Sequence, residues 1–242
     1  MRFDGRKDDE LREIKIKIGV LRNVDGSAYF QIGKTKVIAG AFAPRILHPK
    51  HLQKQDRAII RFQYDMLPFS VPERKKPGPT RRSIELSKII REVLEGVVFV
   101  NEFPRSVIDV YVKVINADAG TRCAAINAAC LALAQAGVPM IDLVAAVAVG
   151  KVGQRIVLDL CKKEEDYGEL VPINEYYGEG KAADMPLAYC PLRKEFLLIQ
   201  MDGEISSEDL EKMLALGKKG CLTIYEIMKK SLKEGRYPWE QE

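Results

Sequence analysis

The chain has 242 residues, of which 47% are apolar, and its net charge is +4. This length and apolar content suit one large domain or two small ones, and the charge is too small to indicate nucleic-acid binding by itself. The five cysteines contain no Cys-x-x-Cys pair, which argues against a zinc ribbon or a disulfide framework. The N-terminus has no apolar signal region and no apolar stretch approaches ~20 residues, so we expect a cytosolic protein without a membrane partner.

In the first half of the chain, alternating apolar residues predict strands and helical spacing predicts one helix. Ile14, Ile16 and Ile18 alternate with charged residues, as in a half-buried strand. Residues 26–42 read as two strands joined by a turn at Gly33. The other expected elements of this half are a strand over residues 57–67, a helix over 82–97 and a strand over 105–116.

The second half is predicted to contain two helices and two hairpins. In order, these are a helix over residues 121–136, a hairpin over 144–160 turning near Gly150–Gly153, a hairpin over 185–203 turning at Arg193–Lys194, and a helix over 206–235. Ser206 and Asp209 resemble a capping pair at the start of that last helix. This order predicts an α+β fold, one domain over 1–242 with its core at about 10–235, in which mixed β-sheets are packed with helices.

Two predicted helices begin with cations, where the helix dipole is already positive. Arg122 follows Gly120 and Thr121 at the start of the Ala-rich helix, and Arg81 and Arg82 open the earlier one. A cation there costs ~0.3–1 kcal/mol at an exposed site, but a bound anion reverses the sign. Free N–H groups with a guanidinium form a phosphate site, so we predict phosphate at Gly120–Arg122 and a phosphodiester at the arginine pair. The alternative is that these are ordinary surface arginines.

Acidic residues gather in the segments "DLCKKEEDYGE" and "KAADMP". They are Asp159, Glu164, Glu165, Asp166 and Asp184. Carboxylates opposite a phosphate site suit Mg²⁺, which prefers oxygen ligands, and a carboxylic acid can also protonate a leaving oxygen. A solvated charge run explains "KKEED" equally well, but Asp184 stands at the start of an apolar strand, where a lone charge is unexpected.

Two further features have weaker signals. Tyr64, in "YDMLPFS", can stack on a base, or it can be an ordinary strand aromatic. His48 and His51 form a His-x-x-His pair that lacks a third nearby ligand, so a polar loop is the better reading than a metal site.

Several of these segments, taken together and in this order, resemble the RNase PH family. They are "RRSIELSKIIREVLEG", "FPRSVIDVYVKVINADAGTRCAAINAA", "AGVPM", "VAVGKV" and "ADMPLAYCP". The segments "RFDGRKDDELREIKI" and "YDMLPFSVPERKKPGPTRR" are closer still to the branch that forms the catalytic ring of archaeal exosomes. The resemblance runs nearly end to end.

The resemblance implies a 3′→5′ exoribonuclease that uses inorganic phosphate as co-substrate and releases nucleoside diphosphates. It implies an RNase PH-like fold similar to ribosomal protein S5 domain 2. It also implies a hexameric ring with a paralogous RNase PH-like subunit, RNA-binding cap subunits, and RNA as substrate. The family's phosphate-binding residues fall on Gly120, Thr121 and Arg122, and its RNA-binding residues fall on Arg81, Arg82 and Tyr64. On this reading the arginines stand at helix starts because their partners are phosphates.

The chain departs from the family around the acidic pair. The family has two aspartates flanking a short segment of the form "EDxxGEAD", whereas here residues 170–182 are inserted before Asp184. Asp184 matches through "ADMP" and Asp166 through "EEDYGE", and we expect both to be catalytic and to hold Mg²⁺. Either the insertion bulges outward and leaves Asp166 in place, or Glu175 or Glu179 replaces it. A non-catalytic RNA-binding ring subunit and a tRNA-trimming homohexamer stay open as alternatives.

Overall fold

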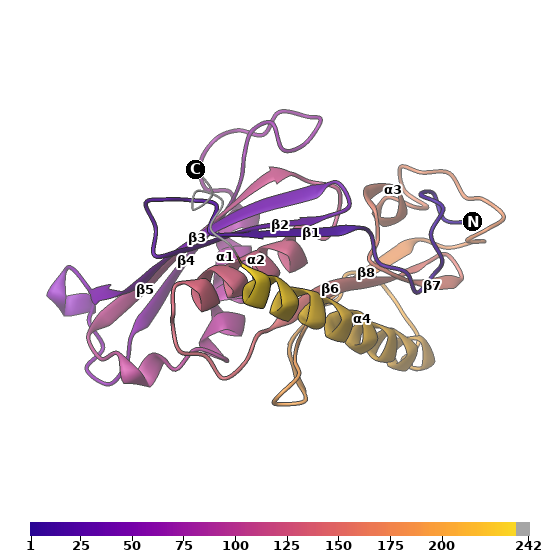
Figure 1. Cartoon of the computed structure of the whole chain (residues 1–242). Helices are drawn as coiled ribbons and strands as arrows, with labels where there is room; N and C mark the ends of the chain where they lie inside the picture. The colour runs from indigo at the N-terminus through magenta and orange to yellow at the C-terminus, as the bar shows by residue number, and fades with distance from the viewer. Residues whose placement is uncertain (236–242) are drawn as a thin grey trace.

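The computed structural model describes residues 1–235 and consists of two β-sheets that share a central helix, α2 (Figure 1). In chain order the elements are β1 (Ile14–Ile18), β2 (Gly26–Ile32), β3 (Thr35–Ile46), the 3₁₀ turn η1 (Lys50–Leu52), β4 (Ile59–Met66), α1 (Arg81–Glu95), the 3₁₀ turn η2 (Val100–Glu102), β5 (Ser106–Asn116), α2 (Thr121–Gln135), β6 (Ala145–Val152), β7 (Arg155–Leu158), α3 (Lys162–Glu165), β8 (Ala182–Cys190), β9 (Glu195–Ile199) and α4 (Ser207–Glu234).

The two sheets differ in their strand directions. The first has the order β1-β2-β3-β5-β4. In this sheet β4 pairs with β5 in parallel, and all other neighbouring strands are antiparallel. The second has the order β7-β6-β8-β9 and is antiparallel throughout. The expectation of an α+β fold is confirmed, although only the first of these sheets is mixed.

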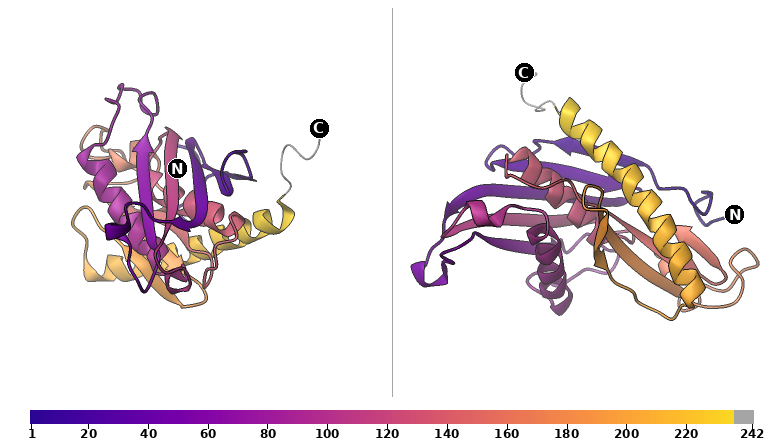
Figure 2. Two further views of the ribbon diagram at one scale, coloured as in Figure 1. Left: turned by 90° about the vertical axis from the view of Figure 1, so that its left-hand side faces the viewer. Right: turned by 90° about the horizontal axis from the view of Figure 1, so that it is seen from below.

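The two long C-terminal-half helices are placed by their small and apolar residues. Most side chains of α2 are buried, because it is apolar on every side and contacts β2 and β3 of one sheet and β6 of the other. Helix α4 buries a stripe consisting of Met213, Gly217, Gly220, Cys221, Ile224 and Met228. It passes β7, β6 and β8 and reaches the edge strand β1 (Figure 2). The buried residues of both sheets form one cluster.

The structure refines the expected elements in four places. The hairpin of β6 and β7 turns at Gly153, the far end of the expected range, and Gly150 lies inside β6. Asp184 is inside β8 rather than at its start, and α3 forms in the segment that reads as a solvated charge run. The N-terminal segment packs ahead of the predicted core limit of about residue 10, with Arg2 only 3% exposed.

Two expectations concern the whole chain rather than single helices or strands. Of the single domain predicted over 1–242, residues 236–242 lie outside the described part, and the domain boundaries stay a prediction. None of the helices within residues 1–235 combines the length and apolar character that a membrane span requires.

Candidate active site

A cavity of about 1230 Å³ lies where the starts of α1 and α2 face α3 and β8. Its lining includes five of the predicted residues: Arg81, Arg82, Arg122, Asp166 and Asp184. A smaller adjoining recess is lined by Gly120 and Thr121 and shares Arg122 and Asp184 with the cavity. Residues that are far apart in the sequence therefore meet around one connected space.

The start of α2 is built to accept an anion. Gly120 precedes the helix with φ +64°, a left-handed conformation that favours glycine, and glycine has no side chain to cap the helix. By contrast, Thr80 and Ser206 cap α1 and α4 through their hydroxyls. The first N–H groups of α2 thus face the recess without a capping side chain, which is the arrangement that binds phosphate. At α1 the Thr80 hydroxyl already caps the helix start. An anion there would therefore be bound by the side chains of Arg81 and Arg82 rather than by backbone N–H groups.

Arg122 has unused hydrogen-bonding capacity in this space. Its Nη1 donates to Oε1 of Gln200 at 2.6 Å. Its Nε is buried and has no hydrogen-bond partner among residues 1–235. A buried guanidinium N–H without a partner is costly, so this geometry favours an anionic ligand. Gln200, just after β9, is a lining residue that sequence reasoning missed, because no motif marks it.

Asp184 is held by its backbone and leaves its carboxyl free. Its N–H and C=O each pair with Asp202 at 2.9 Å. Its Oδ1 is buried and has no hydrogen-bond partner in the described part of the chain. Burial, followed by repulsion from the Glu165 carboxylate, raises the pKa of Asp184 to about 7 against the opposing effect of Arg122. A carboxyl that is partly protonated near neutral pH suits an acid catalyst, and its unpaired oxygen also suits a metal ion.

The short helix α3 and the residue that follows it present two further carboxylates to the cavity. Asp166 Oδ1 accepts from Lys162 Nζ at 2.8 Å, and Glu165 Oε2 accepts from the same Nζ at 3.2 Å. Both carboxylates line the cavity, and Glu165 also lines the recess. Glu165 is therefore a second candidate partner for Asp184; the sequence placed it in the acidic cluster but did not assign it to the site.

The inserted stretch, residues 170–182, leaves and returns at nearly the same point. Ala182 N–H donates to the Tyr167 carbonyl at 3.2 Å. Gly168, with φ +76°, lies so close to Gly180 that a Cβ on it would be 2.7 Å from the Gly180 carbonyl oxygen. Inside the excursion the Tyr167 hydroxyl donates to the Gly178 carbonyl at 2.8 Å. The excursion thus starts and ends beside Tyr167, packs the buried Tyr177 against Glu164 of α3, and leaves Asp166 at the cavity.

Glu175 and Glu179, both among the described residues, lie outside the cavity lining. We expect Asp166→Asn and Glu165→Gln each to lower turnover by about 10–100-fold, because each removes a negative charge from the cavity that Asp184 lines. Glu175→Gln is the matched control from the insertion and should leave turnover unchanged. Steady-state rates on an RNA substrate test this, and a large loss in the control with none at Asp166 would transfer the role to the insertion.

Tyr64 does not lie where a base can stack on it. The side chain is 2% exposed, and its hydroxyl donates to Thr121 Oγ1 at 3.0 Å. Its backbone N–H donates to Ser87 of α1 at 2.9 Å, so the residue is enclosed between α1 and α2. The stacking interpretation is wrong for this arrangement, and Tyr64 instead contacts the start of the phosphate-facing helix.

Two other acidic residues from the predicted cluster are structural. Asp159 is buried and its carboxylate pairs with Arg12 at 2.7 Å. Glu164 is buried and pairs with Arg2 at 2.7 Å. Because each already has a buried cationic partner, neither is available to the cavity, and the acidic cluster contracts to Glu165, Asp166 and Asp184.

The raised pKa of Asp184 has a consequence for stability. The folded chain keeps this proton up to about pH 7, while the unfolded chain releases it near the ordinary value of 3.8. The contribution of Asp184 to stability is therefore full below that ordinary value and is lost as pH rises towards 7. We expect Asp184→Asn to be more stable than the parent at about pH 8, by on the order of 1–3 kcal/mol, with little difference at about pH 4. Urea unfolding of the purified chain at both pH values measures this; a difference that does not change with pH would contradict it.

Comparisons with known proteins show the family to which this chain belongs. The model described as "3′ exoribonuclease family, domain 1" matches residues 10–139, and that described as domain 2 matches residues 142–220. The chain is 52% identical over 233 residues to the exosome complex component Rrp41 of Thermococcus kodakarensis, covering 96% of this chain and 88% of the relative. It is 50% identical over 234 residues to Rrp41 of Methanopyrus kandleri, covering 97% and 92%.

Two solved structures share the fold. Rice (Oryza sativa) Rrp46 superposes with a TM-score of 0.82 at 23% identity, covering 96% of this chain and all of that one. A chain of the Archaeoglobus fulgidus exosome with RNA bound to the active site superposes with a TM-score of 0.76 at 20% identity, covering 93% and 91%. The RNase PH-like fold is thereby confirmed.

Proposed function

This chain belongs to the 3′ exoribonuclease family, and from that premise we propose that it is the catalytic subunit of an archaeal exosome ring. In this role it is a phosphorolytic 3′→5′ exoribonuclease that shortens RNA with inorganic phosphate and releases nucleoside diphosphates. The observation that carries the proposal is the meeting of the uncapped start of α2, Arg122 and the unpaired Asp184 carboxyl around one space.

In the proposed reaction, each step uses a different part of this space. Phosphate binds at the start of α2 with Arg122, and Arg81 and Arg82 hold the phosphodiester at the RNA 3′ end. A phosphate oxygen attacks the terminal phosphorus, and the bond from that phosphorus to the 3′-oxygen of the preceding nucleotide breaks. That oxygen takes a proton and stays on the shortened RNA, and Asp184 is placed to supply the proton. Because phosphate attacks instead of water, the reaction is not a hydrolysis.

Magnesium fits the same carboxylates. The unpaired Oδ1 of Asp184 offers a free ligand, and Asp166 faces the same cavity. Within residues 1–235, no group of three or more His, Cys, Asp or Glu side chains is placed to hold a metal, so His48 and His51 form no such site. Mg²⁺ commonly uses one or two carboxylates with water and substrate phosphates, so Asp184 and Asp166 are the two protein ligands that we propose. When bound, the ion would neutralise negative charge at the departing oxygen.

The relatives support assembly with other subunits, because proteins half identical to this chain are named as exosome components. We propose that the assembly is a hexameric ring with a paralogous subunit and RNA-binding caps, and that it works in the cytoplasm. A non-catalytic ring subunit would not need a buried, unpaired carboxyl at a phosphate site. A tRNA-trimming homohexamer is less consistent with the near full-length identity to Rrp41.

Phosphate dependence tests the proposal. The ring assembled from this chain and its paralogue should degrade poly(A) only when inorganic phosphate is added, because the attacking group binds at α2. Products separated by chromatography should be nucleoside diphosphates. Full-rate degradation in phosphate-free buffer, with monophosphates as products, would contradict it.

A further inference from the structure

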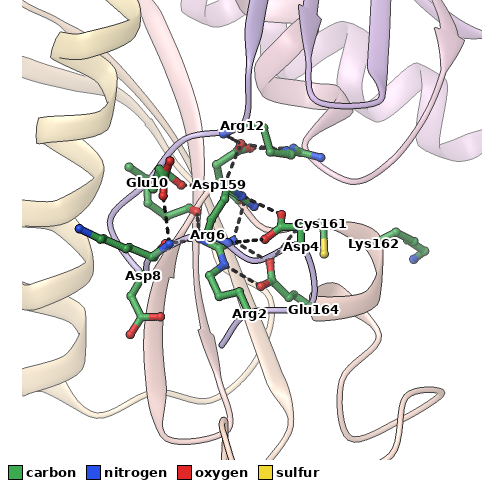
Figure 3. Close-up of polar contacts among 12 residues, drawn as sticks. Arg2, Asp4, Arg6, Asp8, Glu10, Arg12, Asp159, Cys161, Lys162 and Glu164 are labelled. Carbon is green, nitrogen blue, oxygen red and sulfur yellow. Dashed lines mark hydrogen bonds and ion pairs between the residues drawn. The ribbon is translucent and has the colours of Figure 1, made fainter.

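The N-terminal segment, residues 1–12, packs against the elements that carry the proposed site (Figure 3). Two of its arginines are buried, Arg2 at 3% and Arg12 at 7% exposed. Neither lines the cavity. Their charged partners, Glu164 and Asp159, do not line it either, so the cost of burying the arginines is offset by ion pairs that lie behind the site.

Arg2 holds α3. Its Nε and Nη2 each donate to a different carboxylate oxygen of Glu164 at 2.7 Å. Its Nη1 donates to the Leu158 carbonyl at 2.8 Å, and its Nη2 to the Asp159 carbonyl at 3.0 Å. Glu164 precedes Glu165 and Asp166, and α3 has only four residues. A helix that short does not hold itself in place, so the direction of the two cavity carboxylates depends on the Arg2 fork.

Arg12 holds the turn before α2. Its Nε and Nη2 donate to the two carboxylate oxygens of Asp159 at 2.8 and 2.7 Å, and its Nη1 donates to the Asp118 carbonyl. Ala119 and Gly120 then take consecutive left-handed conformations, φ +58° and +64°. A non-glycine residue in that region is strained and persists only where its surroundings fix it.

The contacts made by Arg2 and those made by Arg12 meet at Asp118 and Asp159. Asp159 accepts the Arg12 fork with its carboxylate and an Arg2 N–H with its carbonyl. Asp118 accepts from Arg12 with its carbonyl, and its Oδ1 accepts from the N–H of Lys162, the first residue of α3, at 3.2 Å. The phosphate-facing turn and the carboxylate-bearing helix are thus fixed to one buried ionic cluster.

We propose that Arg2 and Arg12 are positioning residues of the active site, Arg2 for the carboxylates of α3 and Arg12 for the phosphate-binding start of α2. The inference rests on the proposed function, because it assigns Arg2 to the carboxylates that act on the leaving oxygen and Arg12 to the binding of the attacking phosphate. Neither arginine touches a reactant; each acts through the residue that it holds.

The test replaces Arg2 or Arg12 by lysine in the assembled ring, because the single ammonium of lysine cannot reproduce the two-pronged hydrogen bonding of the guanidinium to a carboxylate. A misplacement of about 1 Å can cost on the order of 10²-fold. Arg12→Lys should therefore raise the KM for inorganic phosphate by about 10–100-fold, and excess phosphate should restore its rate. Arg2→Lys should lower kcat by a similar factor without changing that KM.

The matched control is Asp8→Asn, which removes an outer contact of the same segment. Asp8 accepts from Arg155 at 3.0 Å and from the Tyr176 hydroxyl at 2.7 Å, and it contacts neither α3 nor the turn before α2 through its side chain. It should leave kcat and KM unchanged. If all three variants match the parent ring in kcat and KM, or lose activity equally, the inference is overturned. A parent ring without phosphate-dependent activity would instead overturn the proposed function.

Hydrogen exchange of the purified full chain tests the positioning roles of Arg2 and Arg12 in the absence of the ring. Arg2→Lys should accelerate amide exchange at residues 162–168, and Arg12→Lys should accelerate it at residues 117–123. Exchange that is unchanged, or raised evenly over the whole chain, would overturn the positioning role.

Discussion

Replacing Asp184 with asparagine is expected to lower turnover by roughly 10²-fold or more, the usual reach of a general acid. Asparagine keeps the size of the side chain and its backbone pairing with Asp202. It cannot donate an acidic proton, and it is a poor ligand for Mg²⁺. Turnover of the assembled ring on an RNA oligonucleotide, at saturating phosphate, measures the loss.

The control for this variant is Asp202→Asn. Asp202 lines the same cavity and contacts Asp184 through backbone atoms, which the substitution retains. Its carboxylate contributes less than burial and Glu165 to the raised pKa of Asp184, so the substitution leaves the main causes of that shift in place. Ring assembly and RNA binding should be unchanged in both variants, while only Asp184→Asn loses turnover. An Asp184→Asn ring that degrades RNA at the parental rate would favour the non-catalytic alternative.

Replacing Arg122 with alanine is expected to raise the phosphate requirement. Hydrogen bonds to a charged group contribute about 1.5–3 kcal/mol, and the unpaired Nε of Arg122 is available for one. Loss of that interaction should raise the KM for inorganic phosphate by roughly 10–150-fold, because each 1.4 kcal/mol is about tenfold. The measurement is the initial rate of diphosphate release as a function of phosphate concentration.

Arg81→Ala provides the matched comparison for Arg122. Arg81 lines the cavity but not the recess at the start of α2. Its loss should weaken RNA binding and reduce the salt dependence of that binding, with no change in phosphate saturation. Should Arg122→Ala leave phosphate saturation unaltered, the assignment of phosphate to the start of α2 fails.

Much of the fold was predictable from local patterns. The alternation of Ile14, Ile16 and Ile18 predicts β1, and the Ala-rich run from Thr121 predicts α2, because strand and helix periods are written in consecutive residues. Helix α3 was missed, since its four residues read as a charge run and its position depends on the distant Arg2.

The site residues likewise fall into two groups: those that local sequence identifies and those that depend on contacts between distant segments. Charge at a helix start identifies Arg122, and a lone charge in an apolar strand identifies Asp184, both from neighbouring residues. The burial of Tyr64, the pairing of Asp159 with Arg12 and the contribution of Gln200 all join segments far apart in the sequence. No local pattern carries that information, so sequence reasoning could not separate Asp159 from the cavity carboxylates.

The most direct test of the account follows the attacking phosphate itself. The assembled ring is incubated with unlabelled RNA and radiolabelled inorganic phosphate, and the mononucleotide products are separated. Phosphorolysis at α2 predicts that the label enters the products as the β-phosphate of nucleoside diphosphates, and that Arg122→Ala reduces its entry at limiting phosphate. Unlabelled nucleoside monophosphates as the products would show that water is the nucleophile and would contradict the account.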